Sequence, residues 1–404
     1  MVARSSVMFG RCSAAEPVGV AAALMVAVPV SFQAETAFGL ALAAALALPA
    51  HSGALVADNA TTATSSQATI TVHASGLNNP RGLKFGPDGQ LYVAEGGIGG
   101  ALSTTGLCAQ VVPPIGPYTG SPTGSRISRI NANGYRETVA DGFPSSQTDA
   151  GSGALVSGVA DIAWIDDTLY AVLAGAGCSH GVAKIPNGVV RVGRHGDWKL
   201  VADLSRFQAG HPTAVIEPDD YEPDGTWYSM VAVDDALYAV EPNHGELDRI
   251  TPAGRIHRVA DISASLGHFV PTAMAYRDGA FYVGNLGTFP IVQGGSKIVR
   301  ITPHGRIDVV ATGLTAVTGI AFDRRGRMYV LENTVGHPFP APNAGRVVRV
   351  HRSGELEVIA SNLLLPTAMT FGRDGALYVS AAGFGLPPQG LGQILKIELT
   401  RDSD

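Results

Sequence analysis

Residues 275–285 read AYRDGAFYVGN: a short apolar run, the turn Arg277-Asp278-Gly279, and a second apolar run. This pattern is typical of a β-hairpin, in which two strands are joined by a tight turn. Nearly the same text stands at KFGPDGQLYVAE, AFDRRGRMYVLE and TFGRDGALYVSA, and a looser version at AWIDDTLYAVL and VAVDDALYAVE. The chain therefore contains one hairpin six times, which predicts a repeat fold.

The spacing of the hairpins indicates which repeat fold this is. Each hairpin carries one tyrosine, at Tyr92, Tyr170, Tyr238, Tyr282, Tyr329 and Tyr378. The last three separations are 44, 47 and 49 residues, the length of one four-stranded propeller blade. The first two are longer because each includes an insertion expected to form a loop on one face, the first at residues 96–125 and the second at residues 207–227. A third strand with one basic residue follows each hairpin, at Arg129, Arg191, Arg249, Arg300, Arg349 and Lys396. We expect these basic residues to pack or pair on blade surfaces, since a residue that recurs in every repeat usually serves the repeat.

A fourth strand follows only five of the hairpins. The last repeat stops at ILKIELTRDSD, whereas ITVHASGL, residues 70–77, precedes the first hairpin and resembles the fourth strand IDVVATGL. The amino-terminal strand should therefore complete the last blade by pairing with residues 394–397, which removes a free sheet edge. We predict an all-β, six-bladed β-propeller of four-stranded blades over residues 69–399, followed by a tail at 400–404.

The first 57 residues have the features of a secretory signal. Arg4 and Arg11 precede two uncharged stretches, 17–34 and 36–50, and small residues follow. We expect removal of residues 1–57, a linker at 58–68, and a secreted, periplasmic or cell-envelope protein; an uncleaved anchor is the alternative. No later stretch is long and apolar enough to span a bilayer. The net charge of −6 gives no reason to expect nucleic-acid binding, and we expect a monomer.

Propeller geometry predicts where a site could form. The starts of first strands and the ends of second strands should surround one channel mouth. Glu95, Glu241, Asn285 and Glu332 fall at equivalent second-strand ends, and their oxygens suit Ca²⁺ or another divalent cation. The alternative is that each side chain binds backbone N–H groups of its own loop. First-strand starts supply Arg81, Thr272, Thr318 and Thr367 as candidate binding residues.

Three histidines lie in the loops on the same face: His180, His244 and His337. His244 is the candidate catalytic base because Glu241 precedes it by three residues, and the neighbouring Asn243 is a candidate binding residue. Each histidine precedes Gly or Pro, so a plain turn role is the alternative. GxSxG, HExxH, Walker and Rossmann motifs are all missing from the sequence.

Cysteines provide a further prediction. Cys12 lies in the expected signal, which leaves Cys108 and Cys178 in loops of neighbouring blades on one face. We predict a disulfide between them, since export supplies an oxidising compartment. Two independent buried thiols are the alternative.

The stretches NNPRGLKFGPDGQLYVAE, EPDGTWYSMVAV, YAVEPNHGEL and VPTAMAYRDGAFYVGNLGTFPI resemble the ScyD/ScyE family of propellers, over essentially all of residues 70–399. The hairpins alone also resemble NHL and gluconolactonase-like propellers. The resemblance implies the fold and export, and it brings no catalytic residues. Two functions remain open: an exported propeller that binds a small molecule, glycan or protein at its channel mouth, or a metal-dependent hydrolase or lyase of the lactonase kind.

Overall fold

The computed structural model describes residues 68–113, 115–148, 155–384 and 389–400, all within the unit formed by residues 60–404. These residues form six antiparallel sheets, so the fold is an all-β six-bladed propeller, as predicted. The expected signal, its cleavage site and the carboxy-terminal tail at 401–404 lie outside the described residues. No helix in the described part of the chain is long and apolar enough to cross a membrane.

The first blade contains β2 (Pro80–Phe85), β3 (Leu91–Glu95), β4 (Thr119–Ile130) and β5 (Arg136–Gln147), with the short β6 (Val156–Ser157) at its edge. The second contains β7 (Val159–Ile165), β8 (Thr168–Leu173), β9 (Gly188–Val192) and β10 (Trp198–Asp203). The third contains β11 (Ser229–Val233), β12 (Ala236–Glu241), β13 (Glu246–Ile250) and β14 (Ile256–Asp261).

The fourth blade contains β15 (Pro271–Arg277), β16 (Ala280–Asn285), β17 (Ser296–Ile301) and β18 (Ile307–Leu314). The fifth contains β19 (Val317–Phe322), β20 (Met328–Glu332), β21 (Gly345–Val350) and β22 (Leu356–Leu363). The sixth contains β23 (Ala368–Phe371), β24 (Leu377–Ala381), β25 (Gly392–Glu398) and β1 (Thr69–Leu77).

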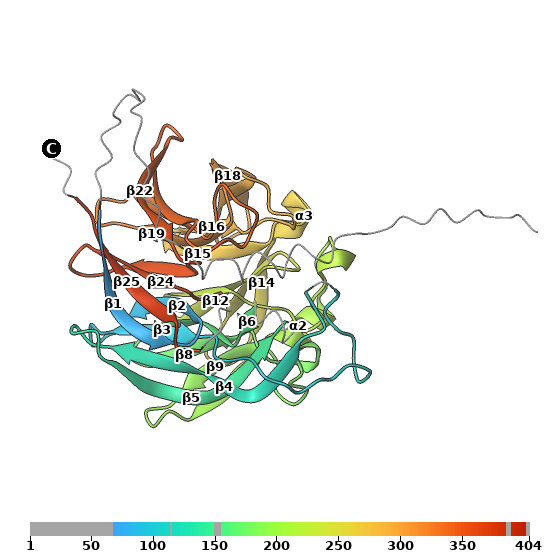
Figure 1. The fold of residues 1–404 in the computed structure, drawn as a ribbon. Helices are drawn as coiled ribbons and strands as arrows, with labels where there is room; N and C mark the ends of the chain where they lie inside the picture. The colour runs from blue at the N-terminus through green and yellow to red at the C-terminus, as the bar shows by residue number, and fades with distance from the viewer. Residues whose placement is uncertain (1–67, 114, 149–154, 385–388, 401–404) are drawn as a thin grey trace, which may run out of the picture. The chain divides into compact units, whose positions relative to one another are not determined.

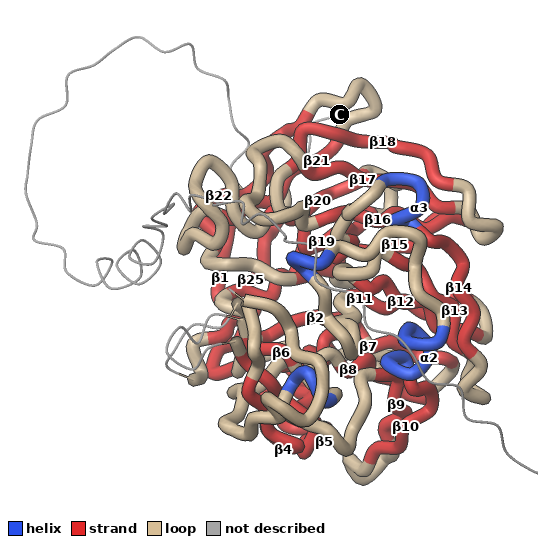
Figure 2. Tube along the Cα trace, turned by 90° about the vertical axis from the view of Figure 1, so that its right-hand side faces the viewer, coloured by secondary structure: helices blue, strands red, loops and turns tan. Residues whose placement is uncertain are grey.

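The first strands form a closed ring. Each of β2, β7, β11, β15, β19 and β23 contacts the next, and β23 contacts β2. In Figure 2 the labelled first strands surround the centre, while β5, β10, β14 and β18 lie toward the edge. The starts of first strands and the ends of second strands therefore meet at one face, as predicted.

The ring is closed by the amino-terminal strand. β1 pairs antiparallel with β25, with Ile70 opposite Ile397 and Ala74 opposite Ile394. Figure 1 shows β1, at the blue end of the colour scale, beside the red β25. The predicted pairing of residues 70–77 with residues 394–397 is confirmed, and the last blade has no missing strand.

The recurring tyrosine and the recurring basic residue are cross-strand partners. Tyr92 lies opposite Arg129 and Tyr378 lies opposite Lys396, and the same register holds in the four blades between them. Arg129, Arg249 and Lys396 also pair with an acid in the hairpin turn of their own blade, as Lys396 does with Asp374 at 3.0 Å. The blade-surface interpretation of these residues is confirmed, since cross-strand pairs stabilise a sheet locally.

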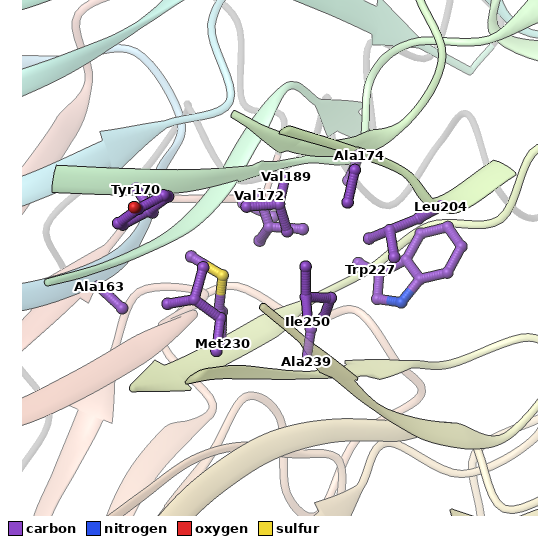
Figure 3. Packing of buried hydrophobic residues seen from close by; sticks show 13 residues of the cluster. Ala163, Tyr170, Val172, Ala174, Val189, Leu204, Trp227, Met230, Ala239 and Ile250 are labelled. Atoms are coloured by element: carbon purple, nitrogen blue, oxygen red, sulfur yellow. The ribbon is translucent and has the colours of Figure 1, made fainter. Parts of the chain in front are cut away.

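The blades pack face to face through apolar side chains. Figure 3 shows the core between the second and third blades, where Tyr170 and Val172 face Met230 and Ile250. A buried carboxylate also joins blades here, since Asp161 accepts hydrogen bonds from Lys84 Nζ at 2.5 Å and Met230 N at 2.8 Å. The contacts of Asp161 thus connect the first three blades.

Two features depart from the sequence prediction. Residues 119–125, expected in a loop, are part of β4 because β5 also extends and pairs with them through bulges. Short helices α2 (Leu204–Gly210) and α3 (Ile262–Leu266) follow the fourth strands of the second and third blades. Asp203 and Asp261 cap them by accepting hydrogen bonds from Arg206 N and Ala264 N. The VADL and VADI sequences at these points contain that capping signal.

Candidate functional site

A cavity of about 120 Å³ lies where first-strand starts meet the loops after second strands. It is lined by residues of five blades and of the two insertions, among them Arg81, Tyr118, Glu222, Trp227, Tyr228 and Phe384. The channel-mouth face that the hairpin alignment indicated therefore carries a cavity. Small-molecule sites are typically such concave, largely apolar pockets with a few convergent polar groups.

One wall of the cavity is anchored in the core of the propeller. Trp227 and Ala174 line the cavity and also belong to the packed core between the second and third blades. Figure 3 shows the Trp227 ring beside Leu204 in that core. Its indole nitrogen donates a hydrogen bond to Asp248 at 3.4 Å. The wall is consequently held by the scaffold, which preorganises the site.

A second wall is built by the disulfide-linked loops. Cys108 and Cys178 form a disulfide with Cα atoms 6.3 Å apart, so the predicted bond is confirmed in this structure. Thr104 donates a hydrogen bond to the Cys178 carbonyl, and Ser179 donates to Asp224 through Oγ at 2.6 Å. The bond ties the first insertion to the loop that carries His180.

A chain of polar groups runs from the cavity lining to the buried His180. Tyr118 donates to Glu222 at 2.9 Å, and the buried His180 has Nε2 3.6 Å from Glu222 and Nδ1 2.9 Å from Ser146. Burial and the charge on Glu222 raise the pKa of Tyr118 well above its ordinary value. The phenol therefore stays protonated at neutral pH and donates its hydrogen bond to Glu222. His268 pairs with Asp220 at 2.9 Å at the same side of the cavity.

The candidate metal ligands end their second strands as predicted, but their oxygens bind neighbouring groups. Glu95 accepts from Arg126 at 2.8 Å and from Asn78 N, Glu332 accepts from Arg346 and Thr315 N, and Asn285 accepts from Lys297 N. Glu241 accepts from Thr226 N and His244 N. In the described part of the chain, no three His, Cys, Asp or Glu residues gather to hold a metal ion. In this arrangement the four side chains do not fit a shared cation, because their oxygens already accept hydrogen bonds from neighbouring groups.

The candidate base His244 does not line the cavity. It is buried, with Nδ1 2.5 Å from Gln208 and 3.2 Å from Glu241. Burial lowers the pKa of His244, but the charge of Glu241 and its hydrogen bond outweigh burial, so the net pKa is raised. His337 is exposed. Asn243, which precedes His244 in the chain, does line the cavity, and its side chain donates a hydrogen bond to the Asp220 carbonyl at 3.1 Å.

The three candidate threonines join neighbouring blades. The hydroxyls of Thr272, Thr318 and Thr367 donate to Val317 O, Pro366 O and Pro80 O, each at the start of the following blade. Of the three, only Thr272 is among the residues lining the cavity.

The sequence did not indicate Tyr118, Glu222, Tyr228 or Phe384 as site residues, because they come from insertions and loops whose paths the repeats do not define. Their signal was the aromatic and acidic content of two insertions on the predicted face.

Glu246 is buried close to the carboxylates of Glu241 and Asp248, and its protonation makes the free energy of unfolding depend on pH. Burial raises the pKa of Glu246 to about 7, although Arg258 lowers it. This pKa lies above the unfolded value of about 4.3, so the folded state keeps the proton in the window between them. The free energy of unfolding should therefore fall as pH rises from about 4.5 to 7, by about 3 kcal/mol at most.

Urea unfolding of the wild type and Glu246→Gln at pH 5, 6, 7 and 8 measures this dependence. The variant should have a flatter profile than the wild type. Glu355→Gln, at an exposed position, is the control for the change in net charge. A wild-type stability that stays level or rises across the window, or a variant with the same slope, would contradict the expectation.

No protein-family model matches this sequence, and no curated protein sequence matches it. Among solved structures, a gluconolactonase from Xanthomonas campestris has a TM-score of 0.52 at 12% identity, over 82% of this chain and 90% of that one. The PQQ-bound aldose sugar dehydrogenase of Streptomyces coelicolor has a TM-score of 0.51 at 15% identity, over 83% of this chain and 99% of that one. A Thermus protein described as an oxidoreductase (glucose dehydrogenase) has a TM-score of 0.50 at 18% identity, over 82% of this chain and 99% of that one. At these identities the likeness shows a shared propeller fold and nothing finer.

Proposed function

We propose that this chain is an exported β-propeller that binds a small molecule in the channel-mouth cavity. The observation that carries the proposal is the cavity itself, with aromatic walls and a few buried polar groups at the face where loops of five blades converge. Its volume of about 120 Å³ favours a small molecule over the glycan or protein ligands that the sequence left open.

Export is supported by the amino-terminal segment and by the disulfide, since disulfides persist in oxidising compartments. Membership of the ScyD/ScyE family is part of the same proposal. It rests on the stretches around EPDGTWYSM and EPNHGEL. Trp227, Tyr228 and Asn243 in these two stretches line the cavity, so the most specific part of the resemblance coincides with the proposed binding site.

The metal-dependent hydrolase or lyase is the alternative. It requires Glu95, Glu241, Asn285 and Glu332 to release their present partners and converge on one ion. We derive no catalytic step through such a cation. Metal analysis of the purified protein, with a lactonase and esterase screen in the presence and absence of chelator, tests this alternative directly.

Blocking the cavity tests the binding proposal. Ala160 lines the cavity at the start of the second blade, so Ala160→Leu places additional side-chain volume there. Thermal shift assays with a panel of single-ring acids, amides and alcohols, glucose and glucono-1,5-lactone should identify compounds that raise the Tm of the wild type, because ligands stabilise the state that they bind. The same compounds should leave the Tm of Ala160→Leu unchanged.

Ala321→Leu is the matched control. Ala321 lies in the first strand of the fifth blade, has the same 8% exposure as Ala160, and is not among the residues lining the cavity. Both substitutions overpack a strand, at a cost of about 1–3 kcal/mol. Only Ala160→Leu should lose the ligand response. A panel that stabilises both variants equally, or that never stabilises the wild type, counts against binding at this cavity.

A further inference from the structure

Arg81 places a buried positive charge in the wall of the cavity. It lies near the start of β2, lines the cavity and is only 8% exposed. One guanidinium nitrogen donates to the Val156 carbonyl, and the rings of Tyr228 and Phe384 lie 5.7 and 5.8 Å from Cζ. A guanidinium has five N–H donors and stays charged at any pH at which the protein folds.

No carboxylate of the described residues lies within 4.0 Å of the Arg81 guanidinium. The two acids that line the cavity have other partners: Asp220 pairs with His268, and Glu222 accepts from Tyr118. Among the described residues, the charge of Arg81 therefore has no ion-pair partner. A buried charge is costly unless it is paired, so the cavity favours a ligand that brings the negative charge.

Three other arginines of this fold each form an ion pair with a buried carboxylate, which Arg81 does not. Arg126 pairs with Glu95 at 2.8 Å, Arg346 pairs with Glu332 at 2.5 Å, and Arg258 pairs with Glu246. Each of those carboxylates is fully buried. None of the three arginines is among the residues lining the cavity, whereas Arg81 is.

The remaining walls limit the rest of the ligand. Leu155, Val270, Leu286, Phe289 and Phe384 present apolar surface to the cavity. A dry apolar cavity of about 150 Å³ is known to hold one benzene ring, so about 120 Å³ admits a single ring or a short branched chain. Asp220 and Glu222 at the same cavity disfavour a second anionic group by charge repulsion.

We propose that the cavity binds a compact organic monocarboxylate, with the carboxylate on Arg81 and a single-ring or short branched apolar body against the hydrophobic walls. This inference rests on the proposed function and names its ligand class. Arginine is suited to the task because its planar fork donates two parallel hydrogen bonds to a carboxylate. The rings of Tyr228 and Phe384 both lie within cation–π distance of the guanidinium and help to hold it in place.

Calorimetric titration with benzoate, benzamide and terephthalate tests the proposal. Benzoate and benzamide have nearly the same shape and differ in charge, whereas terephthalate adds a second carboxylate. Benzoate should bind the wild type at least about tenfold more tightly than benzamide, as expected for a charge-assisted hydrogen-bond pair. Terephthalate should bind more weakly than benzoate.

Arg81→Met removes the charge and keeps most of the side-chain length, so it should abolish the preference for benzoate. Arg306→Met is the control, because Arg306 has 75% of its side chain exposed and pairs with Asp308 on the surface. It removes the same charge from the protein and should leave the preference intact. A preference that survives in Arg81→Met would overturn the role of Arg81.

The wild-type measurements decide the case even if Arg81→Met does not fold. Equal affinities for benzoate and benzamide, or no benzoate binding at about 10 mM, overturn the proposal. Binding of neutral probes that Ala160→Leu removes, with no preference for benzoate, leaves the proposed function standing and rejects only the ligand class. Failure of every probe to respond to Ala160→Leu rejects both.

Discussion

A chain that lacks residues 69–77 should not form a soluble, cooperatively folding propeller. Those residues are β1, which completes the last blade beside β25 and buries Leu77 and Ala74 in the core that also holds Ile394. Without β1, the edge of β25 presents unpaired backbone groups and invites edge-to-edge association. Removal of two buried side chains and a strand's worth of hydrogen bonds should cost on the order of 5 kcal/mol or more, which approaches the whole stability of many domains.

The register supplies a matched control for this deletion. Thr69 lies opposite Glu398, so a short turn can join the end of β25 to the start of β1. A circular permutant that begins at Asn78 and carries residues 69–77 after Leu399 restores the strand with its pairing. Size-exclusion chromatography and thermal unfolding should show aggregation for the deletion and a monomer with a cooperative transition for the permutant. A deleted chain that remains a monomer with wild-type Tm is incompatible with closure by β1.

Loss of the disulfide between Cys108 and Cys178 should lower the free energy of unfolding by about 4 kcal/mol. The two cysteines are 70 residues apart, and in a chain-entropy model a bond across that span restricts the unfolded chain by this amount. The loop that carries Cys108 also carries Tyr118 of the cavity wall. Reduction should therefore weaken ligand binding as well as stability.

Urea unfolding of the wild type and of a double Cys108→Ser/Cys178→Ser variant, each with and without dithiothreitol, measures the contribution of the bond. The reductant should shift the wild-type midpoint toward that of the variant, and it should leave the variant unchanged. Alkylation of the unreduced mature protein provides an independent check. Two alkylated thiols per chain, or a wild-type midpoint that equals the variant's under oxidising conditions, would contradict the bond.

The sequence by itself was sufficient for the fold. The hairpin of residues 275–285 recurs because apolar alternation and turn residues are local signals, and six copies at blade spacing admit few architectures. The missing fourth strand of the last repeat and the orphan strand at residues 70–77 then required closure. The disulfide followed from loop positions in neighbouring blades. All of these conclusions depend on periodicity and counting along the chain.

The candidate site was predicted only in part. Alignment placed Glu95, Glu241 and Glu332 at the ends of second strands, and the structure has each of them there. Alignment could not decide which way each oxygen points. The cross-strand register puts Arg126 opposite Glu95 and Arg346 opposite Glu332, and these arginines take the carboxylates. A charge on the adjacent strand is closer than any residue across the channel, so the local partner prevails.

Only the tertiary structure brought Arg81, Tyr228 and Phe384 together around one guanidinium. They come from the first, third and sixth blades, and two of them lie outside the strands of the repeat. The same holds for Asp161, whose bonds to Lys84 and Met230 join three blades. Such contacts depend on the angle between blades and on loop conformation, which are set by packing over the whole ring. Local sequence patterns carry the strand and the turn, whereas the partners of a buried charge are decided when distant segments close on one another.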